Sequence, residues 1–222
     1  MPQFNLEARE ITLKIVYYGP ALSGKTTNIQ QIHAMVTRDG AGEMVTLDTQ
    51  GDRTLYFDFL PIEIGCEGEY LIKLKLFTVP GQVMHRATRR VVLAGVDAIA
   101  FVADSKRESA SANAYSYRDL EANLRANGID IAAMPSVVQF NKRDLEDIKS
   151  LEEVRAAWKD TGVPTIPAVA VKGEGVLETF RELMERLYRS LDERHDFGRK
   201  FGLTLEGFIG AVMGHFSEKP AE

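Results

Sequence analysis

The chain has very little cysteine. Cys66 is the single cysteine among 222 residues, so an internal disulfide is excluded and a reducing compartment is favoured. Long apolar runs are also missing, because no stretch is long enough to span a bilayer. Residues 1–3 (MPQ) offer no glycine for myristoylation, and residues 219–222 (KPAE) are not a prenylation box. We therefore expect a cytoplasmic protein with no direct membrane insertion, which reaches a membrane only through a partner.

Clusters of positive charge are absent as well. The 27 Lys and Arg and 32 Asp and Glu residues give a net charge of −5 and a pI near 5.5. This balance provides no electrostatic footprint for nucleic acid, so no nucleic-acid partner is expected. No internal repeat stands out. A hydrophobic content of 45% in a chain of this length is ordinary for one α/β domain with a sizeable core.

A phosphate-binding loop is the most specific motif that the chain contains. Residues 19–26 (GPALSGKT) fit the pattern G-x-x-x-x-G-K-[ST] and follow the apolar run 11–18, which predicts a buried strand. Two glycines let backbone N–H groups surround phosphates, Lys25 can reach the terminal phosphates, and the Thr26 hydroxyl can bind magnesium. The expected ligand is a nucleoside triphosphate. The alternative is a glycine-rich turn that only joins a strand to a helix.

A second motif indicates the base. Residues 141–144 (NKRD) follow the apolar run 136–140, at the C-terminal end of a predicted strand. Asp144 can accept from the ring N–H and the amine of guanine, whereas adenine would leave this carboxylate unpaired. Asn141 can bridge to the phosphate loop, and the Lys142 stem can cover one face of the base. Alone, four residues are a weak match typical of a charged turn; after a phosphate loop they predict guanine.

With both motifs present, the chain resembles the Ras-like small GTPases, and most closely the bacterial MglA-type (gliding-motility protein A) group. The resemblance covers about residues 8–191 and rests on 19–27 (GPALSGKTT), 52–54 (DRT) and 78–82 (TVPGQ). It implies GTP/GDP and magnesium as ligands, and GTP hydrolysis that is slow without an activator. It also implies a roadblock-type homodimeric GTPase-activating protein, effectors of unknown identity, and a theme of cell polarity or motility with recruitment to a cell pole.

The resemblance assigns roles to individual residues. Gln82 is similar to the glutamine that orients the attacking water, Arg53 to an arginine that this group carries in its own chain, and Thr54 to the switch threonine. The implied catalytic residues are Gln82 and Arg53, and the implied metal ligands are Thr26 and Thr54. The implied nucleotide-binding residues are Gly19, Ala21, Leu22, Ser23, Gly24, Lys25, Thr26, Thr27, Thr54, Gly81, Asn141, Lys142, Asp144, Ala170 and Val171.

Two positions depart from the wider Ras pattern. Thr78 stands where most such proteins have a magnesium-associated Asp, although the MglA-type group also has Thr there. Because a hydroxyl carries no charge, magnesium would depend more on the phosphates, on Thr26 or on another carboxylate. Asp58 in the apolar strand 55–60 is a candidate, and an edge-strand Asp facing solvent is the alternative. Ala21 replaces the group's usual Gly, and its methyl can crowd the catalytic side chains beside the third phosphate.

The order of the patterns predicts an α/β fold of the Ras-like P-loop type. It has a mostly parallel central sheet with one antiparallel strand pair, helices on both faces, and a C-terminal helical extension. Strands are expected at 11–18, 54–60, 70–77, 98–103, 136–140 and 165–171, and helices at 25–36, 83–93, 110–126, 150–159 and 175–191. The antiparallel pair is 54–60 with 70–77. Residues 150–153 (SLEE) form a capping box.

We divide the chain into a Ras-like GTPase domain, 1–191, and a C-terminal extension, 192–222. Apolar residues of the extension recur at spacings of three and four, as on one face of a helix, but glycines interrupt it. Each interior glycine costs about 1 kcal/mol relative to alanine, so this helix needs a surface to lie on. Packing on the GTPase core is expected. Partner docking, dimerisation and a membrane-surface role are the alternatives.

Three functions from different classes stay open. A GTP-hydrolysing molecular switch is the main prediction. Ala21 motivates the second, a GTP-locked binding module with little hydrolysis. The third is another P-loop ATPase or kinase, against which Asn141 and Asp144 argue.

Overall fold

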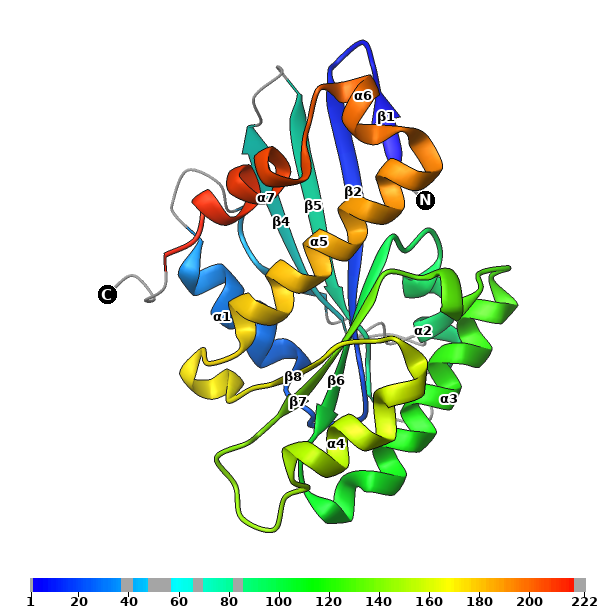
Figure 1. The fold of residues 1–222 in the computed structure, drawn as a ribbon, viewed down its shortest axis with the longest axis vertical. Helices are drawn as coiled ribbons and strands as arrows, with labels where there is room; N and C mark the ends of the chain where they lie inside the picture. Colours follow the sequence, from blue (N-terminus) through cyan, green and yellow to red (C-terminus); the bar gives the residue numbers. More distant parts are fainter. Residues whose placement is uncertain (1, 37–41, 48–56, 66–69, 82–85, 218–222) are drawn as a thin grey trace.

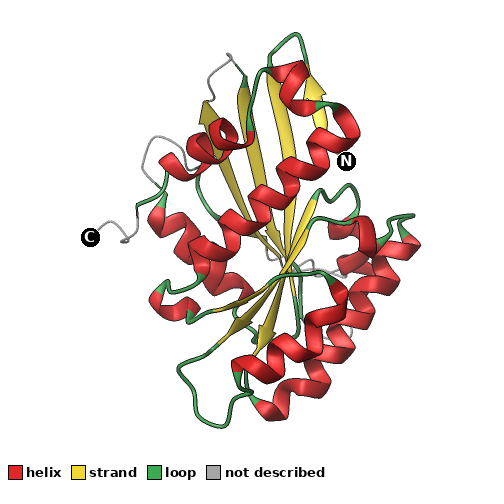
Figure 2. Ribbon diagram, in the orientation of Figure 1, coloured by secondary structure: helices red, strands yellow, loops and turns green. Residues whose placement is uncertain are grey.

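The computed structural model describes residues 2–36, 42–47, 57–65, 70–81 and 86–217. In these residues one mixed sheet lies between helices on both faces, as Figure 1 and Figure 2 show. The strands are β1 (Gln3–Asn5), β2 (Glu10–Tyr18), β3 (Val45–Leu47), β4 (Phe57–Gly65), β5 (Leu71–Thr78), β6 (Ala98–Asp104), β7 (Ser136–Asn141) and β8 (Thr165–Pro167). The α-helices are α1 (Lys25–Met35), α2 (Arg86–Leu93), α3 (Ala110–Ala126), α4 (Leu151–Trp158), α5 (Val176–His195), α6 (Phe197–Phe201) and α7 (Leu205–Gly214).

The sheet has the strand order β3-β4-β5-β2-β6-β7-β8, and β1 pairs with β2 beside this path. Neighbouring strands from β5 through β2, β6 and β7 to β8 run parallel. The pairs β1·β2, β3·β4 and β4·β5 are antiparallel. Parallel strands need crossover connections, and helices supply them here. The predicted fold class is confirmed, including the antiparallel pair that joins β4 and β5.

Each face of the sheet has its own hydrophobic core. Side chains alternate along β2, so Tyr17 packs on the side of α1, α5, α6 and α7, and Tyr18 packs on the side of α2, α3 and α4. Phe180 of α5 and Leu120 of α3 are central members of the two cores. Every residue of β6 is buried, as expected for a parallel strand covered on both faces. Packing on both faces holds the carboxyl ends of the parallel strands in place, so the loops that follow them can form a site.

The expected strand 54–60 is wrong in its extent. In the structure β4 runs Phe57–Gly65, while residues 54–56 lie outside the described residues. The strand continues past Pro61, and the alternation buries Ile62 and Ile64 against the core. Pro61 lies past residues 57–59, the part of β4 that pairs with β3, and a proline is tolerated where a strand has an unpaired edge.

The expected strand 165–171 is too long. The ladder of β8 ends at Pro167, and residues Ala170–Lys172 form a 3-10 turn. Pro167 has no N–H to donate, and the Ala170 N–H donates to the Asn141 side chain instead of to a strand. The other predicted elements agree closely, and the capping box at Ser150 is confirmed. Helix α2 begins at Arg86, so residues 83–85 of the expected helix lie outside the description, and the three-residue strands β1 and β3 were not predicted.

The C-terminal segment forms two helices after α5, not the one predicted. Gly202 has a φ of 68°, a left-handed conformation that ends α6. Thr204 then caps α7, because its hydroxyl oxygen accepts from the Gly207 N–H at 3.0 Å. Helix α5 itself continues to His195. The division of the chain at 191/192 stays a prediction.

The extension packs on the rest of the chain. Phe197, Phe208 and Val212 are fully buried in the core that α5 shares with the sheet, and Phe208 lies against Tyr188 of α5. At the end of the described chain, the Ser217 N–H donates to the Met35 carbonyl at 2.9 Å. Intramolecular packing on the GTPase core was expected, and the structure shows it. No helix within the described residues is both long and apolar enough to cross a membrane.

Candidate nucleotide-binding site

The phosphate loop connects β2 to α1 and depends on its glycines. Gly19 and Gly24 have φ values of 150° and 102°, where a side chain is strained. A Cβ on Gly19 would lie 2.2 Å from the Val102 carbonyl oxygen, and one on Gly24 would lie 2.2 Å from Asn141 Nδ2. Both glycines are therefore required by φ and by close approach. Leu22, at a φ of 61°, is 88% exposed on the loop.

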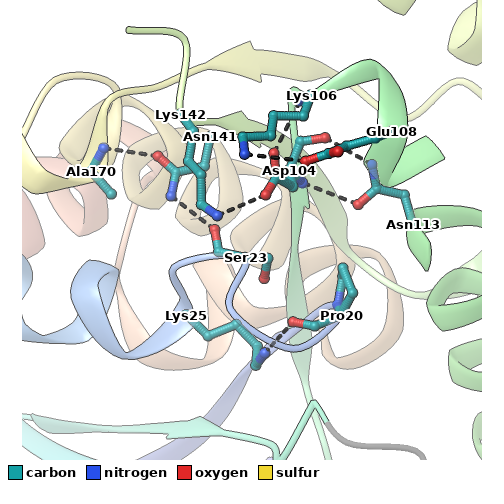
Figure 3. A network of polar contacts seen from close by, with 10 residues as sticks. All are labelled: Pro20, Ser23, Lys25, Asp104, Lys106, Glu108, Asn113, Asn141, Lys142 and Ala170. Atoms are coloured by element: carbon teal, nitrogen blue, oxygen red, sulfur yellow. Dashed lines mark hydrogen bonds and ion pairs between the residues drawn. The ribbon is translucent and has the colours of Figure 1, made fainter. Parts of the chain in front are cut away.

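Lys25 lies inside this loop, in the first turn of α1. Its Nζ donates to the carbonyl oxygens of Pro20 at 2.7 Å and Gly19 at 3.1 Å, and the first contact is drawn in Figure 3. Burial lowers the pKa of the Lys25 ammonium to about 8, although the nearby Asp58 carboxylate opposes this effect. The ammonium is thus held where backbone dipoles satisfy it and where phosphate oxygens would stabilise its charge.

Asn141 joins the phosphate loop to a second loop. Its Nδ2 donates to the Ser23 carbonyl at 2.9 Å, and its Oδ1 accepts from the Ala170 N–H at 2.8 Å (Figure 3). The predicted bridge to the phosphate loop is confirmed. The second bond also fixes the 3-10 turn Ala170–Lys172, on which Val171 is 67% exposed.

Lys142 has an acidic partner that the motifs did not indicate. Its backbone adopts a φ of 66°, and its Nζ lies 2.7 Å from Asp104 Oδ2 (Figure 3). Asp104 ends β6 and is itself held by Lys106 and Asn113. The signal available in the sequence was a carboxylate, Asp104, directly after the apolar run 98–103. Asp144 is exposed.

Asp58 lies between two threonines. Its Oδ2 accepts from the Thr26 hydroxyl at 2.6 Å and from the Thr78 hydroxyl at 3.0 Å. The Asp58 N–H in turn donates to Thr78 Oγ1 at 2.8 Å. Asp58 is buried, so the alternative of a solvent-facing aspartate is wrong. The reason is that β4 is an inner strand, paired with both β3 and β5.

Gly81 lies directly against the phosphate loop. A Cβ on Gly81 would lie 2.4 Å from the Ala21 nitrogen and 2.7 Å from the Pro20 carbonyl carbon. The backbone of Gly81 therefore lies close against the backbone of Pro20 and Ala21. Ala21 is exposed and lines a cavity of about 600 Å³ that extends from the loop to Arg89 and Asp119. Thr27 is half-buried in the first turn of α1.

Comparison with known proteins identifies the family. Residues 3–187 match the model of the ADP-ribosylation factor family. The chain belongs to this family of small GTPases. The mutual gliding-motility protein MglA of Myxococcus xanthus (strain DK1622) is 42% identical over 191 residues, which cover 86% of this chain and 98% of that protein. This GTPase therefore binds guanine nucleotide, hydrolyses GTP to GDP and phosphate, and is a small GTPase switch of the MglA type, not an ATPase or kinase.

Three implied site residues of this GTPase fall outside the description. Arg53, Thr54 and Gln82 lie in 48–56 and 82–85, which the structure does not describe. Their roles stay predictions. The structure does bring Thr26, Gly81 and the Asn141 motif to the same edge of the sheet, around the phosphate loop.

A buried ion pair beside the site was missed by sequence reasoning. Arg89 of α2 donates from Nε to Asp119 Oδ2 of α3 at 2.7 Å and from Nη1 to the Pro80 carbonyl at 3.3 Å. The Tyr18 hydroxyl donates to the same carboxylate oxygen at 2.5 Å, and burial together with this bond raises the pKa of Tyr18. The network holds α2 against α3 and against the segment that precedes Gly81. Nothing in the local sequence distinguishes Arg89 from a solvated helix arginine.

Proposed function

We propose that this GTPase is a molecular switch that regulates bacterial cell polarity or motility by binding effectors in one nucleotide state. The relative's name, a gliding-motility protein, supports this theme. A homodimeric roadblock-type protein would act as its GTPase activator. Recruitment from the cytoplasm to a cell pole would then occur through partners.

The bridge made by Asn141 is the observation that carries the nucleotide assignment. One side chain holds the phosphate loop through Ser23 and the opposing turn through Ala170. We assign the terminal phosphates to Lys25 and the N–H groups of the loop, and guanine to Asp144. Lys142, whose Nζ pairs with Asp104, would cover one face of the base.

The residues around Thr26 fit magnesium. Magnesium prefers hard oxygen ligands and usually keeps several waters, and the structure places a hydroxyl and a carboxylate oxygen 2.6 Å apart at the start of α1. We propose that Thr26 and Thr54 bind the ion and that Asp58 holds its water shell. In most Ras-like proteins an Asp at the position of Thr78 holds this shell. When bound, magnesium neutralises charge on the phosphates. The Thr78 hydroxyl keeps its own task, which is to orient the Asp58 carboxylate.

Hydrolysis is assigned to Gln82, which orients water, and to Arg53, which stabilises the developing phosphate charge. Gly81 brings its segment against Ala21, so the methyl of Ala21 adjoins the region where both side chains would close. This contact motivates the second candidate, a GTP-locked module that hydrolyses GTP only slowly. Ala21→Gly should raise single-turnover hydrolysis if the methyl obstructs closure, and equal rates would show that it does not.

Single-turnover GTP hydrolysis, with and without a roadblock-type activator, tests this function. Gln82→Leu should eliminate hydrolysis, and Arg53→Ala should lower the activated rate about a thousandfold, while both variants still bind GTP. A GTP-locked module would show no activation. Hydrolysis unaffected by either substitution would remove these residues from the site, and tight ATP binding would overturn the base assignment.

A further inference from the structure

Three buried polar side chains lie beneath the site and have no assigned role. Asn28 of α1, Gln139 of β7 and Thr179 of α5 are each 0% exposed. Asn28 and Gln139 pair reciprocally, since Asn28 Nδ2 donates to Gln139 Oε1 at 2.8 Å and Gln139 Nε2 donates to Asn28 Oδ1 at 2.9 Å. Gln139 Nε2 also donates to Thr179 Oγ1 at 2.9 Å.

The remaining bonds of this group go to glycines that begin helices of the site. Asn28 Nδ2 donates to the Gly24 carbonyl of the phosphate loop at 2.9 Å. The Thr179 hydroxyl donates to the carbonyl of Gly175, the residue that precedes α5. Both donors of each amide are therefore used. A fully satisfied network of this kind fixes the relative position of the elements it joins.

The position of Gln139 on β7 connects this network to the site. Residues two apart on a strand point to the same face, so Gln139 and Asn141 project side by side from β7. Asn141 joins the phosphate loop to the turn at Ala170. Gln139 joins the helices that follow the same two segments, α1 through Asn28 and α5 through Thr179. The Asn141 amide thus bridges the two loops, and the Gln139 amide bridges the two helices that follow them.

Stability alone does not account for three polar side chains at this depth. Apolar residues of similar shape often stabilise a core as well as, or better than, a satisfied polar group. Adjacent core positions of the same elements, such as Ile29 and Phe180, are apolar. The polar group stands only where α1, β7 and α5 approach the loops of the site.

We propose that Gln139, with Asn28 and Thr179, is a positioning residue that sets the spacing between the phosphate loop and the guanine-side turn, and thereby slows nucleotide release. The proposal rests on the nucleotide site assigned above. GDP and GTP would both use these two loops. Loss of the Gln139 network should therefore speed the release of both nucleotides alike. Hydrolysis of GTP that is already bound should keep its rate.

The dissociation rate of a fluorescent guanine nucleotide tests this proposal. Thr179→Val keeps the shape of the side chain and removes its hydroxyl, which bonds both Gln139 and Gly175, and release should become about three- to tenfold faster. Tyr188→Phe is the matched control on the same helix, since the buried Tyr188 hydroxyl bonds the Leu203 carbonyl far from the site. The control should lose stability, because a buried bond is lost, with an unchanged release rate.

A double variant separates positioning from folding. Gln139→Leu with Asn28→Leu replaces both partners by apolar groups, so the protein should stay folded with cooperative thermal unfolding while nucleotide release accelerates. Release at the parent rate from Thr179→Val and from the double variant would overturn the inference. Equal acceleration by Tyr188→Phe would also overturn it. Failure of the unmodified protein to retain guanine nucleotide would instead overturn the proposed site.

Discussion

The Asp58 carboxylate and the Thr26 hydroxyl lie 2.6 Å apart, although 32 positions separate them in the chain. Thr26 begins α1, and Asp58 is held from the other side by Thr78 of β5. If Asp58 holds the water shell of magnesium, its charge is what matters. Replacement by the isosteric amide keeps the shape and removes that charge.

Asp58→Asn should therefore lose most of the magnesium dependence of nucleotide retention. We expect nucleotide release in magnesium to become about 10- to 100-fold faster, approaching the rate in a chelator. Dissociation rates with and without chelator measure this. Asp97→Asn, a buried carboxylate that accepts from the Lys14 N–H away from the site, is the control. An unchanged ratio of the two rates in Asp58→Asn would contradict the magnesium assignment.

Lys25 predicts two opposite pH effects. Because burial lowers its pKa to about 8, nucleotide binding above that pH must add a proton, and the protonated fraction of free protein falls about fivefold from pH 8 to 9. Affinity should fall accordingly, with proton uptake visible by calorimetry in buffers of different ionisation enthalpy. Affinity that is constant from pH 7 to 9 would contradict the lowered pKa.

The stability of the nucleotide-free protein should move the other way. In the unfolded chain Lys25 has its ordinary pKa of 10.5, so between pH 8 and 10 the unfolded state binds more protons and the free energy of unfolding rises with pH. Below pH 8 both states are charged and Lys25 adds no slope. Lys25→Met should remove part of this rise in the free energy of unfolding, as measured by urea unfolding at each pH. The part that remains should come from Lys14, whose pKa is also lowered by burial.

The Arg89–Asp119 pair should contribute strongly to stability. Arg89→Met leaves the buried Asp119 charge uncompensated, which costs about 3–5 kcal/mol. The exposed pair of Arg107 and Glu153 has bidentate geometry, yet Arg107→Gln should destabilise the protein far less, because solvent screens this pair. Urea unfolding of the two variants compares them. Similar losses would show that burial does not govern the Arg89 pair.

Phe208 should be essential to the C-terminal extension. It is fully buried between Tyr188 and Phe197, so Phe208→Ala should cost about 3–5 kcal/mol. Val91→Ala on the exposed surface of α2 is the control. Guanine-nucleotide affinity at a temperature where the variant is folded should stay near that of the parent. A large loss of affinity would mean that the extension helps to build the site.

The sequence predicts well what is encoded locally. The phosphate loop and the Asn141 motif have fixed spacings, and their flanking runs place them at strand ends. Errors arose where a local signal was misleading. The expected strand 54–60 ended too early, because the alternation of β4 continues to Gly65, and the periodicity of the tail predicted one helix where Gly202 separates two.

Pairings between distant segments could not be predicted. Thr26 meets Asp58, Arg89 meets Asp119 and Asn28 meets Gln139 only because the topology brings their elements together. Each residue alone reads as an ordinary polar position of a helix or strand. The buried polar part of the site therefore required the fold.

Hydrogen exchange in the GDP-bound and GTP-analogue-bound states tests most directly whether this GTPase is a switch. We expect backbone amides in residues 39–60 and 78–90 to exchange at different rates in the two states, while β6 and β7 exchange alike. Identical exchange throughout both segments would contradict the account, because an effector would then have no nucleotide-dependent state to recognise.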